Sequence, residues 1–469
     1  MKEGNKKRNP RRPKKRSRRK NVDSFPIINP NAAGIDIGSE THWVAVPEDR
    51  DKEPVRKFGC FTADLYIMGD WLENCGIETI VMESTGVYWI PAFQILESRG
   101  FEVKLVNARH VKNVPGRKTD VLDCQWLQRL HTYGLLSGSF RPDDSICVLR
   151  SYWRHRDNLI RYAAAHVQHM QKALTEMNIQ LHKVIRDITG VTGMRIITAI
   201  LSGERDVTKL AKMRDPRVKN SAETIGKALQ GDYRQEHLFA LKQALELYEF
   251  YHQQIQTCDQ RIESYLGQLD SKVDPDSNPL PPSKRANKKP QRNSPRFDLR
   301  THLYRITGVD FTQIDGLDAF SVHKIISETG LDPGAFPTVK NFTSWIGLCP
   351  NNRITGGRVK SANTRKVVNR VADTFRLAAQ SLSNSSTALG AYYRRMRARL
   401  GAPKAITATA HKLARIFYHL WKSGDCYQDP GPDYYENKYK QRVLRNLKRK
   451  AKQLGYEITL QPIPNLEVS

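Results

Sequence analysis

The sequence predicts an α/β domain followed by a mainly helical region. Short β-type runs alternate with helical segments from Ala32 to about Phe140, and the apolar periodicity becomes long and helical from about Ser145 to Asp270. After a Pro-, Ser- and Lys-rich stretch, the sequence is again helical and is broken by Gly-containing turns. A chain of 469 residues is too long for one ordinary hydrophobic core, so two or three domains are expected.

The elements of the α/β domain can be placed one by one. Four apolar runs have the composition of strands, namely residues 32–39, 41–47, 78–85 and 101–108. Three segments have apolar residues at helical spacing, namely 65–75, 91–100 and 119–136. The whole chain is thereby divided into a basic disordered arm (1–30), the α/β domain (31–142), a helical or coiled-coil region (143–270), a basic linker (271–297), a mainly helical C-terminal domain (298–423) and a basic helical tail (424–469).

The helical region carries a long apolar stripe. Its members recur mostly at three- and four-residue intervals: Leu238, Leu241, Leu245, Tyr248, Ile255, Cys258, Ile262 and Leu266. Such a stripe is typical of a coiled coil or a helical hairpin, and it also fits a helix buried inside one domain. The polar remainder of this segment favours a protruding coiled coil that joins two subunits, so a homo-oligomer, either a dimer or a tetramer, is expected.

Composition restricts the class of function. Lys and Arg number 76 against 48 Asp and Glu, a formal net charge of +28, so nucleic acid is the expected partner. The seven Cys residues include no CxxC pair, which argues against a zinc site or a disulfide framework and favours a cytoplasmic protein. We expect no membrane segment, because no window approaches the roughly 18 apolar residues of a span. The basic arm and the basic tail are each either a solvated surface or a contact to phosphates.

Two carboxylates begin the helical segment that follows Thr119, a plausible N-cap. Asp120 and Asp123 lie three residues apart, so both project from the same face of the first turn. Taken alone, the pair is explained by the positive N-terminus of the helix. Alternatively, two repelling charges so placed gain stability from a shared cation.

Two further acids lie on apolar strands. Asp36 stands between Ile35 and Ile37, and Glu83 closes the run TIVME. Buried strand carboxylates are costly unless they are paired or bind metal. Hard oxygen donors of this kind suit Mg²⁺ or Mn²⁺, which promote phosphodiester cleavage. We call Asp36, Glu83, Asp120 and Asp123 the acidic tetrad.

At these residues the chain resembles a known family. GIDIGSETHWVAV, VMESTGVYW and NVPGRKTDVLDCQWLQRLHTYGLL are similar to the RuvC-like, ribonuclease-H-fold domain of DEDD transposases of the insertion sequence 110 family. HLYRITGVDFTQIDGLDAFSVHKIISETG and FTSWIGLCPNNRITGGRV resemble the second domain of that family. The resemblance implies that the tetrad is the metal-binding catalytic set. It also implies a recombinase that moves its own DNA element and whose sites are chosen through a structured, element-encoded guide RNA. The expected location is the cytoplasm of a bacterial-type cell, in association with the nucleoid.

One residue departs from the family pattern. The family carries a nucleophilic Ser before Gly in the segment that here reads Arg353-Ile354-Thr355-Gly356-Gly357-Arg358, so the resemblance implies that Thr355 replaces it. A Thr hydroxyl can attack phosphorus, although its methyl group stiffens χ1 and crowds the approach. The other interpretation is a turn residue that bonds the following backbone. Ser361 is a less well matched alternative nucleophile.

The surrounding residues are suited to phosphate. Glycines let backbone amides approach an anion, and basic side chains supply charge; the expected nucleic-acid-binding set is Arg353, Gly356, Gly357, Arg358, Lys360, Arg365 and Lys366. Residues 314–330 are typical of a helix-hairpin-helix element that grips a DNA backbone through Gly316, or of an ordinary helix pair with a Gly turn.

Three functions from different classes compete on this sequence. The first is the recombinase, with the metal tetrad and a hydroxyl nucleophile both at work. The second is a metal-dependent, structure-specific nuclease of the Holliday-junction type, which uses activated water. The third is a non-catalytic nucleic-acid-binding protein, against which the complete set of four acids argues.

Overall fold

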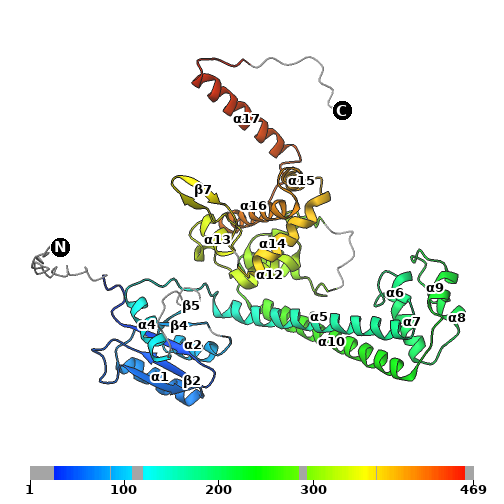
Figure 1. The fold of residues 1–469 in the computed structure, drawn as a ribbon, viewed down its shortest axis with the longest axis horizontal. Coiled ribbons are helices and arrows are strands. Elements are labelled where there is room, and N and C mark those ends of the chain that lie inside the picture. Colours follow the sequence, from blue (N-terminus) through cyan, green and yellow to red (C-terminus); the bar gives the residue numbers. More distant parts are fainter. Residues whose placement is uncertain (1–25, 85, 108–119, 285–292, 366, 460–469) are drawn as a thin grey trace, which may run out of the picture. The chain divides into compact units, whose positions relative to one another are not determined.

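The computed structural model describes residues 26–84, 86–107, 120–284, 293–365 and 367–459 (Figure 1). The chain divides into two compact units, Met1–Arg141 and Pro142–Ser469. The predicted N-cap Thr119, the predicted phosphate contact Lys366 and most of the predicted N-terminal arm lie outside the described residues.

The first unit is built on a five-stranded sheet. Its strands are β1 (Ala32–Ile37), β2 (Thr41–Ala45), β3 (Val55–Gly59), β4 (Thr79–Glu83) and β5 (Glu102–Val106), in the order β3-β2-β1-β4-β5. Strands β1, β2 and β3 form an antiparallel meander, whereas β1, β4 and β5 are parallel. The predicted α/β character of this region is confirmed.

Strand β3 was missed by the sequence analysis. Its sequence VRKFG has no apolar run, and all its residues are partly or fully exposed. The strand lies at the edge of the sheet, where charged side chains are common because they prevent pairing with another chain. The pattern used to find buried strands therefore did not apply to it.

Helices cover both faces of the sheet. Helices α1 (Thr62–Asn74) and α2 (Trp89–Ser98) pack in one core with alternate strand residues such as Ile35 and Ile80. Helix α4 (Asp120–Thr132) packs through Leu127 against Val81 and the β5 residue Val106. Since successive strand residues point to opposite faces, α4 covers the face opposite to α1 and α2.

The second unit begins with a helical hairpin. Helices α5 (Asp144–Glu176) and α10 (Gln235–Gln268) lie side by side over most of their length (Figure 1). Four short helices join them at one end, namely α6 (Leu181–Val184), α7 (Val191–Leu201), α8 (Val207–Lys212) and α9 (Ala222–Ala228). They enclose a core with the facing ends of α5 and α10.

The apolar stripe of α10 is covered within the chain. All eight of its predicted members are buried, and Leu241, Ile262 and Leu266 have no exposed surface. The polar pair Arg156 and Asp259 is buried in the same hairpin, where the guanidinium donates two hydrogen bonds to the carboxylate. The stripe therefore needs no second subunit to cover it, and the expected homo-oligomer stays a prediction without this support.

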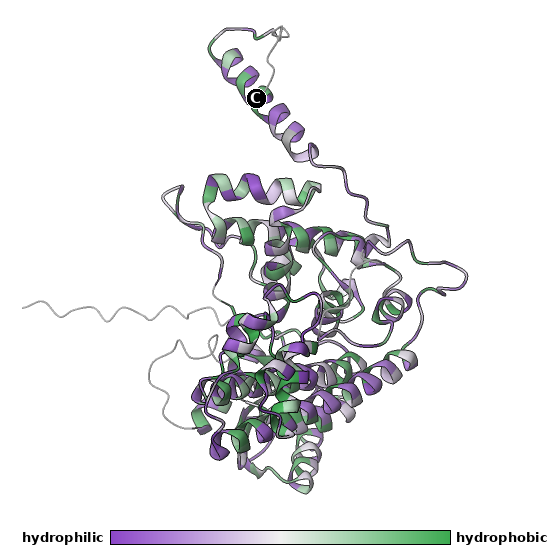
Figure 2. Cartoon of the chain, turned by 90° about the vertical axis from the view of Figure 1, so that its right-hand side faces the viewer, coloured by the Kyte–Doolittle hydropathy of each residue, from purple (hydrophilic) through white to green (hydrophobic). Residues whose placement is uncertain are grey.

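The rest of the second unit is mainly helical. Its elements are α11 (Leu299–Thr307), η1 (Phe311–Gln313), α12 (Ala319–Thr329), η2 (Pro333–Ala335), α13 (Val339–Trp345), β6 (Arg353–Thr355), β7 (Arg358–Ser361), α14 (Arg370–Ser381), η3 (Leu382–Asn384), α15 (Ala388–Leu400), α16 (Ala402–Ser423) and α17 (Tyr434–Gln453). Helix α16 is central, because its Phe417 stacks on Phe311 and meets Phe375 edge to face. Figure 2 shows hydrophilic and hydrophobic residues side by side along α17, at the top of the view.

The described parts of the expected basic linker are attached to this helical body. Lys272 Nζ donates to the carbonyl of Leu331 at 2.9 Å, and Lys284 Nζ lies 3.2 Å from Asp315 Oδ1. Arg300 donates in turn to the carbonyl of Pro281 at 2.6 Å. The segment 271–284 thus lies against the helices, and residues 285–292 are outside the described part of the chain.

In the described residues, no helix has the length and apolar character of a membrane span.

Candidate catalytic site

The first unit brings the acidic tetrad to one edge of its sheet. Ile35 of β1 pairs with Met82 of β4 in parallel register, so the next residues along, Asp36 and Glu83, are at the same level on neighbouring strands. The side chains of Asp36 and Glu83 lie on the same face of the sheet as Val81, and Val81 packs against α4. Helix α4 begins at Asp120, and Asp123 completes its first turn. Four carboxylates from three elements therefore converge on the face that α4 covers.

A glycine lets α4 approach the sheet this closely. A Cβ atom built on Gly34 would lie 2.3 Å from the backbone nitrogen of Gln128 and 2.5 Å from the carbonyl oxygen of Cys124. Real Cβ atoms do not come so near to backbone atoms, so only glycine fits at this position. Gly34 is two residues before Asp36 on the same face of β1, which explains how the first turn of α4 reaches the acid.

The charges of the tetrad act on one another. The half-buried carboxyl of Asp36 has its pKa raised to about 6, first by burial and then by the negative charges of Asp120, Asp123 and Glu83, in that order. The backbone amide of Ile37 opposes this shift only in part. Repulsion among like charges is what a divalent cation would relieve.

The side chains of the tetrad are not closed around a common point. Among the described residues, no three His, Cys, Asp or Glu side chains lie near enough to hold one ion. Asp120 is exposed, whereas Asp36, Asp123 and Glu83 are half-buried. The donor set suits a hard divalent ion in type and charge, but its carboxylates would have to turn toward each other to bind one.

Thr355 lies on a β-hairpin of the second unit, which we call the Thr355 hairpin (Arg353–Ser361). Thr355 pairs with Arg358, which leaves Gly356 and Gly357 as a two-residue turn. Their φ angles are 55° and 73°, the left-handed values that a type I′ turn requires and glycine tolerates. Thr355 is exposed at the end of its strand, while all four acids of the tetrad belong to the other unit.

Most of the predicted phosphate-binding side chains cluster on this hairpin. Arg353, Arg358 and Lys360 are exposed on its strands, and so are the cross-strand partners Ile354 and Val359. Two other predictions fall beside it. Arg365 donates to the carbonyl of Ser344 at the end of α13, and the half-buried Ser361 accepts at 3.4 Å from the backbone amide of Asn363. Ser361 is thus less accessible to a substrate than Thr355.

The turn that precedes α12 has a packing role. Gly316 has a φ of 89°, and a Cβ there would lie 2.8 Å from the carbonyl oxygen of Ala378 in α14. The side chain of Asp318 accepts from the backbone amide of Ser321, so a carboxylate already caps α12. Both features are explained by an ordinary helix pair, and the helix-hairpin-helix element stays a prediction.

Comparison with known protein families matches two segments of the chain. Residues 33–179 match a family model described as a DEDD transposase of IS110 type, and residues 310–394 match one described as Transposase IS116/IS110/IS902 family. The chain belongs to the IS110 family of transposases. No curated protein matches the chain.

Membership gives this IS110-family transposase a reaction and a substrate. It is an enzyme that cleaves and recombines DNA. The first matched segment contains the whole tetrad, and the second contains Thr355 with its hairpin. The two predicted parts of the site thus fall in the two matched segments of the transposase.

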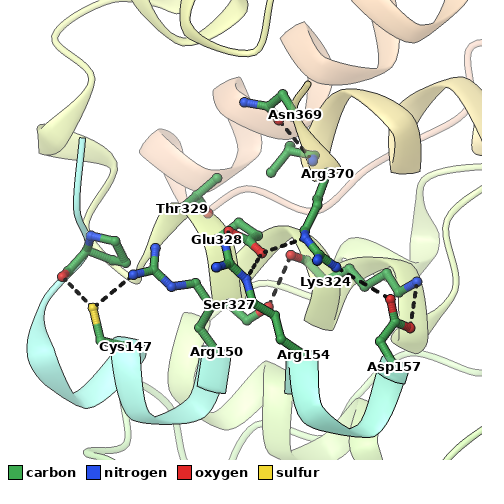
Figure 3. A network of polar contacts seen from close by, with 12 residues as sticks. Cys147, Arg150, Arg154, Asp157, Lys324, Ser327, Glu328, Thr329, Asn369 and Arg370 are labelled. Carbon is green, nitrogen blue, oxygen red and sulfur yellow. Dashed lines mark hydrogen bonds and ion pairs between the residues drawn. The ribbon is translucent and has the colours of Figure 1, made fainter. Parts of the chain in front are cut away.

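An ion network missed by the sequence analysis connects α5 to α12 and α14 (Figure 3). Arg154 of α5 donates to both carboxylate oxygens of Glu328 in α12, at 2.9 and 2.7 Å. Arg370, the first residue of α14, lies 3.9 Å from Glu328 and 3.6 Å from Asp157, and Lys324 lies 3.4 Å from Asp157. The segment that follows the Thr355 hairpin ends at Arg370, where α14 begins. The ion network therefore holds that end of the segment in place.

Proposed function

We propose that this transposase cuts and rejoins DNA with two cooperating parts. One is a divalent-metal site formed by the acidic tetrad, and the other is a hydroxyl nucleophile, Thr355. The observation that carries the proposal is the convergence of four carboxylates at one sheet edge, where three of them help to raise the pKa of the fourth, Asp36, to about 6. A cluster of like charges at a functional edge is typical of a metal-dependent phosphodiester-cleaving site.

Mg²⁺ or Mn²⁺ fits the tetrad by donor chemistry. Carboxylate oxygens are the ligands that these ions prefer, and one or two such ions would offset the mutual repulsion of the acids. When bound, the metal supplies polarisation of the scissile phosphate and stabilisation of the leaving oxygen. The side chains of Asp36 and Glu83, on neighbouring central strands, provide the rigid part of the site, and the first turn of α4 provides the rest.

Thr355 supplies the nucleophile in this proposal. Its Oγ1 attacks phosphorus, an O–P bond forms, and the DNA oxygen leaves with the proton of the hydroxyl. Attack by a DNA hydroxyl on the same phosphorus then restores threonine and joins the new strand. Exposure of Thr355 beside a Gly-Gly turn supports this role, because the turn offers no Cβ to hinder a phosphate.

Three further features belong to the proposal. The first unit takes the RuvC-like, ribonuclease-H fold; its antiparallel meander leading into two parallel strands is compatible with that fold. A structured, element-encoded RNA guides the choice of DNA sites, and the net charge of +28 favours the binding of such polyanions. The active particle is a homo-oligomer, located in the bacterial cytoplasm at the nucleoid.

A second candidate function is supported by one observation. The pairing of Thr355 with Arg358 closes the turn, and this alone explains a threonine at the end of the strand. In that case the tetrad activates water, and the protein is a structure-specific nuclease.

A covalent-adduct assay separates the two functions. Purified transposase is incubated with Mg²⁺, the RNA encoded beside its gene, and a nicked DNA substrate that traps the intermediate, and the products are resolved on a denaturing gel. We expect a protein–DNA adduct that maps to Thr355 by peptide mass. Thr355→Ala removes it, while Thr355→Ser retains it, because Ser differs only by the methyl group.

Ser361→Ala is the matched control, because it removes a neighbouring hydroxyl of the same hairpin. An adduct that survives Thr355→Ala and disappears in Ser361→Ala would assign the nucleophile to Ser361. Cleavage without any adduct would identify the water-activating nuclease.

A further inference from the structure

A basic pocket lies between α15, α16 and α17, and it joins part of the predicted basic tail to residues of α15 and α16 that the sequence did not single out. Its volume is about 510 Å³, within the usual range of ligand pockets. Seven Lys and Arg side chains line the pocket from the three helices: Arg395 and Arg399 of α15, Lys412 and Arg415 of α16, and Lys438, Arg442 and Arg445 of α17. None of the described side chains that line the pocket is acidic.

Lys412 is one of the two cations of this pocket that are not exposed, the other being Arg395. It is half-buried, and its pKa is lowered to about 8, first by burial and then by the positive charges of Arg415 and Lys438. The neighbouring His411 has its pKa lowered by burial and by the same kind of charge, from Arg415 and Lys412. Among the described residues, Lys412 has no carboxylate within ion-pair distance. A buried lysine held among other cations is unfavourable unless an anion joins it.

Aromatic rings hold the cations in place. Lys412 Nζ lies 4.4 Å from the ring centre of Tyr435 and 5.2 Å from that of Tyr392, and the guanidinium of Arg395 lies 4.3 Å from that of Tyr439. Arg395 also donates to the backbone carbonyl of Tyr435 at 2.9 Å, which ties α15 to α17. The charges are thus preorganised around the pocket, which lowers the entropy lost on binding.

One acid that acts electrostatically on this pocket, Asp429, already accepts a hydrogen bond elsewhere. Asp429 contributes to the raised pKa of Tyr435, after burial and the two neighbouring tyrosines, Tyr434 and Tyr392. Its carboxylate, however, accepts from the backbone amide of Ala388 at 3.1 Å, where it caps the start of α15. It therefore stabilises the helix rather than neutralising Lys412.

We infer that this pocket binds consecutive phosphates of a nucleic-acid strand, at a site separate from the Thr355 hairpin. The chemistry it offers is that of phosphodiester recognition, in which Arg side chains donate in pairs to phosphate oxygens and Lys adds a point charge. Lys438, Arg442 and Arg445 recur at four- and three-residue spacing, so they form one face of α17. The positive surface continues along that helix through Lys448, Arg449, Lys450 and Lys452, and an extended surface of this kind fits a polymer better than a small free anion.

Binding, rather than cleavage, tests this inference. The measurement is fluorescence anisotropy of the full chain with labelled single-stranded RNA, single-stranded DNA and duplex DNA of equal length and random sequence, across a salt series. All variants are made in the Asp36→Asn background, and a denaturing gel checks that each labelled strand stays intact, so the binding result holds whether or not the acidic tetrad is catalytic. The variants are Lys412→Gln, on the central pocket cation, and Arg442→Gln, on the exposed face of α17.

We expect each variant to lose about tenfold in affinity for at least one of the three nucleic acids, the typical effect of one charged hydrogen bond. The slope of log K against log salt should flatten by about 0.9 for duplex DNA or about 0.7 for a single strand for each lost phosphate contact. The nucleic acid whose affinity falls identifies the occupant of the pocket. Lys412→Gln should unfold at the same temperature as the parent or higher, because it removes an unfavourably buried charge.

Lys404→Gln is the matched control. It removes an exposed lysine from α16, outside the pocket, and should leave affinity and slope unchanged. Equal binding of all three nucleic acids by both pocket variants and the parent would overturn the inference. So would an equal loss in Lys404→Gln, since the effect would then be one of net charge alone. Arg442→Gln decides the matter if Lys412→Gln fails to fold, because its side chain is exposed.

Discussion

Gly34 of β1 lies against the backbone of Cys124 in α4, so closely that a Cβ at position 34 would come within 2.5 Å of the Cys124 carbonyl oxygen. This contact sets the distance between Asp36 on the strand and the first turn of the helix. The site is therefore sensitive to a residue that carries no functional group.

Gly34→Ala should push α4 away from the sheet. We expect a loss of about 1–3 kcal/mol in the free energy of unfolding, the usual cost of overpacking a core. Cleavage should fall much further than stability, because Asp120 and Asp123 move with the helix. Gly267→Ala is the matched control: it lies in the last turn of α10, where its Cβ would meet nothing within 4 Å, so it should raise stability slightly. Urea unfolding and DNA cleavage measure the two effects, and full cleavage by Gly34→Ala would contradict the close-contact explanation.

The four acid-to-amide variants, Asp36→Asn, Glu83→Gln, Asp120→Asn and Asp123→Asn, should each abolish cleavage at saturating Mg²⁺ and leave nucleic-acid binding intact. One lost ligand charge disables a metal site, whereas the basic surfaces are unchanged. Asp36→Asn should also be as stable as the parent or more so at pH 8, because the folded protein disfavours the charged form of Asp36. Parallel cleavage, binding and thermal-unfolding measurements test this, and persistent cleavage in all four would exclude the tetrad.

The raised pKa of Asp36 predicts a pH dependence with a definite sign. The carboxyl takes up its proton near pH 6 in the folded protein but only near 3.8 in the unfolded chain. Between these values the folded state binds more protons, so the contribution of Asp36 to stability grows as pH falls and is absent above pH 6. The shift amounts to at most about 3 kcal/mol. In chelator, the stability advantage of Asp36→Asn over the parent should be largest at pH 8 and vanish near pH 4; a constant difference would refute the shift.

Features that depend on a local pattern of residues could be predicted from the sequence. The strands with Asp36 and Glu83 were found because apolar residues fill them, and their acids were singled out because a charge in such a run is costly. The first turn of α4 was found because Asp120 and Asp123 precede a helical pattern.

Features that depend on packing between distant segments could not be predicted from the sequence. The apolar stripe of α10 has the same spacing whether its partner is another subunit or α5 of the same chain, so periodicity could not separate the two. The pocket around Lys412 joins three helices, and in each of them the basic residues look like an ordinary solvated face. Gly34 is one glycine among 29, and only the position of Cys124 and Gln128 gives it a role.

Leu241 of α10 should therefore behave as a core residue. Leu241→Ala creates a cavity in the hairpin and should cost about 2–5 kcal/mol in the free energy of unfolding, with no change of particle mass in light scattering. Leu247→Ala, at a partly exposed position of the same helix, is the matched control and should cost far less. A halved mass on Leu241→Ala, without loss of helix, would restore the stripe as a subunit interface.

Glu328 joins α5 to α14, and through Arg370 it reaches the end of the segment that carries the Thr355 hairpin. Its side chain is only 11% exposed, and it accepts two hydrogen bonds from Arg154. Glu328→Gln keeps the shape but leaves the Arg154 and Arg370 guanidinium groups without their shared carboxylate, which should cost about 1–3 kcal/mol. Because Gln has nearly the same shape as Glu, no cavity forms, and the measured loss of stability comes from the lost charge alone. Arg376→Gln is the control, because it breaks a more exposed pair with Asp373 and should cost at most about 0.5 kcal/mol.

Adduct formation at Thr355 should fall in Glu328→Gln and stay normal in Arg376→Gln, even though neither residue belongs to the Thr355 hairpin. If both variants form the adduct at the parental rate, the network supports the fold alone and does not position the nucleophile.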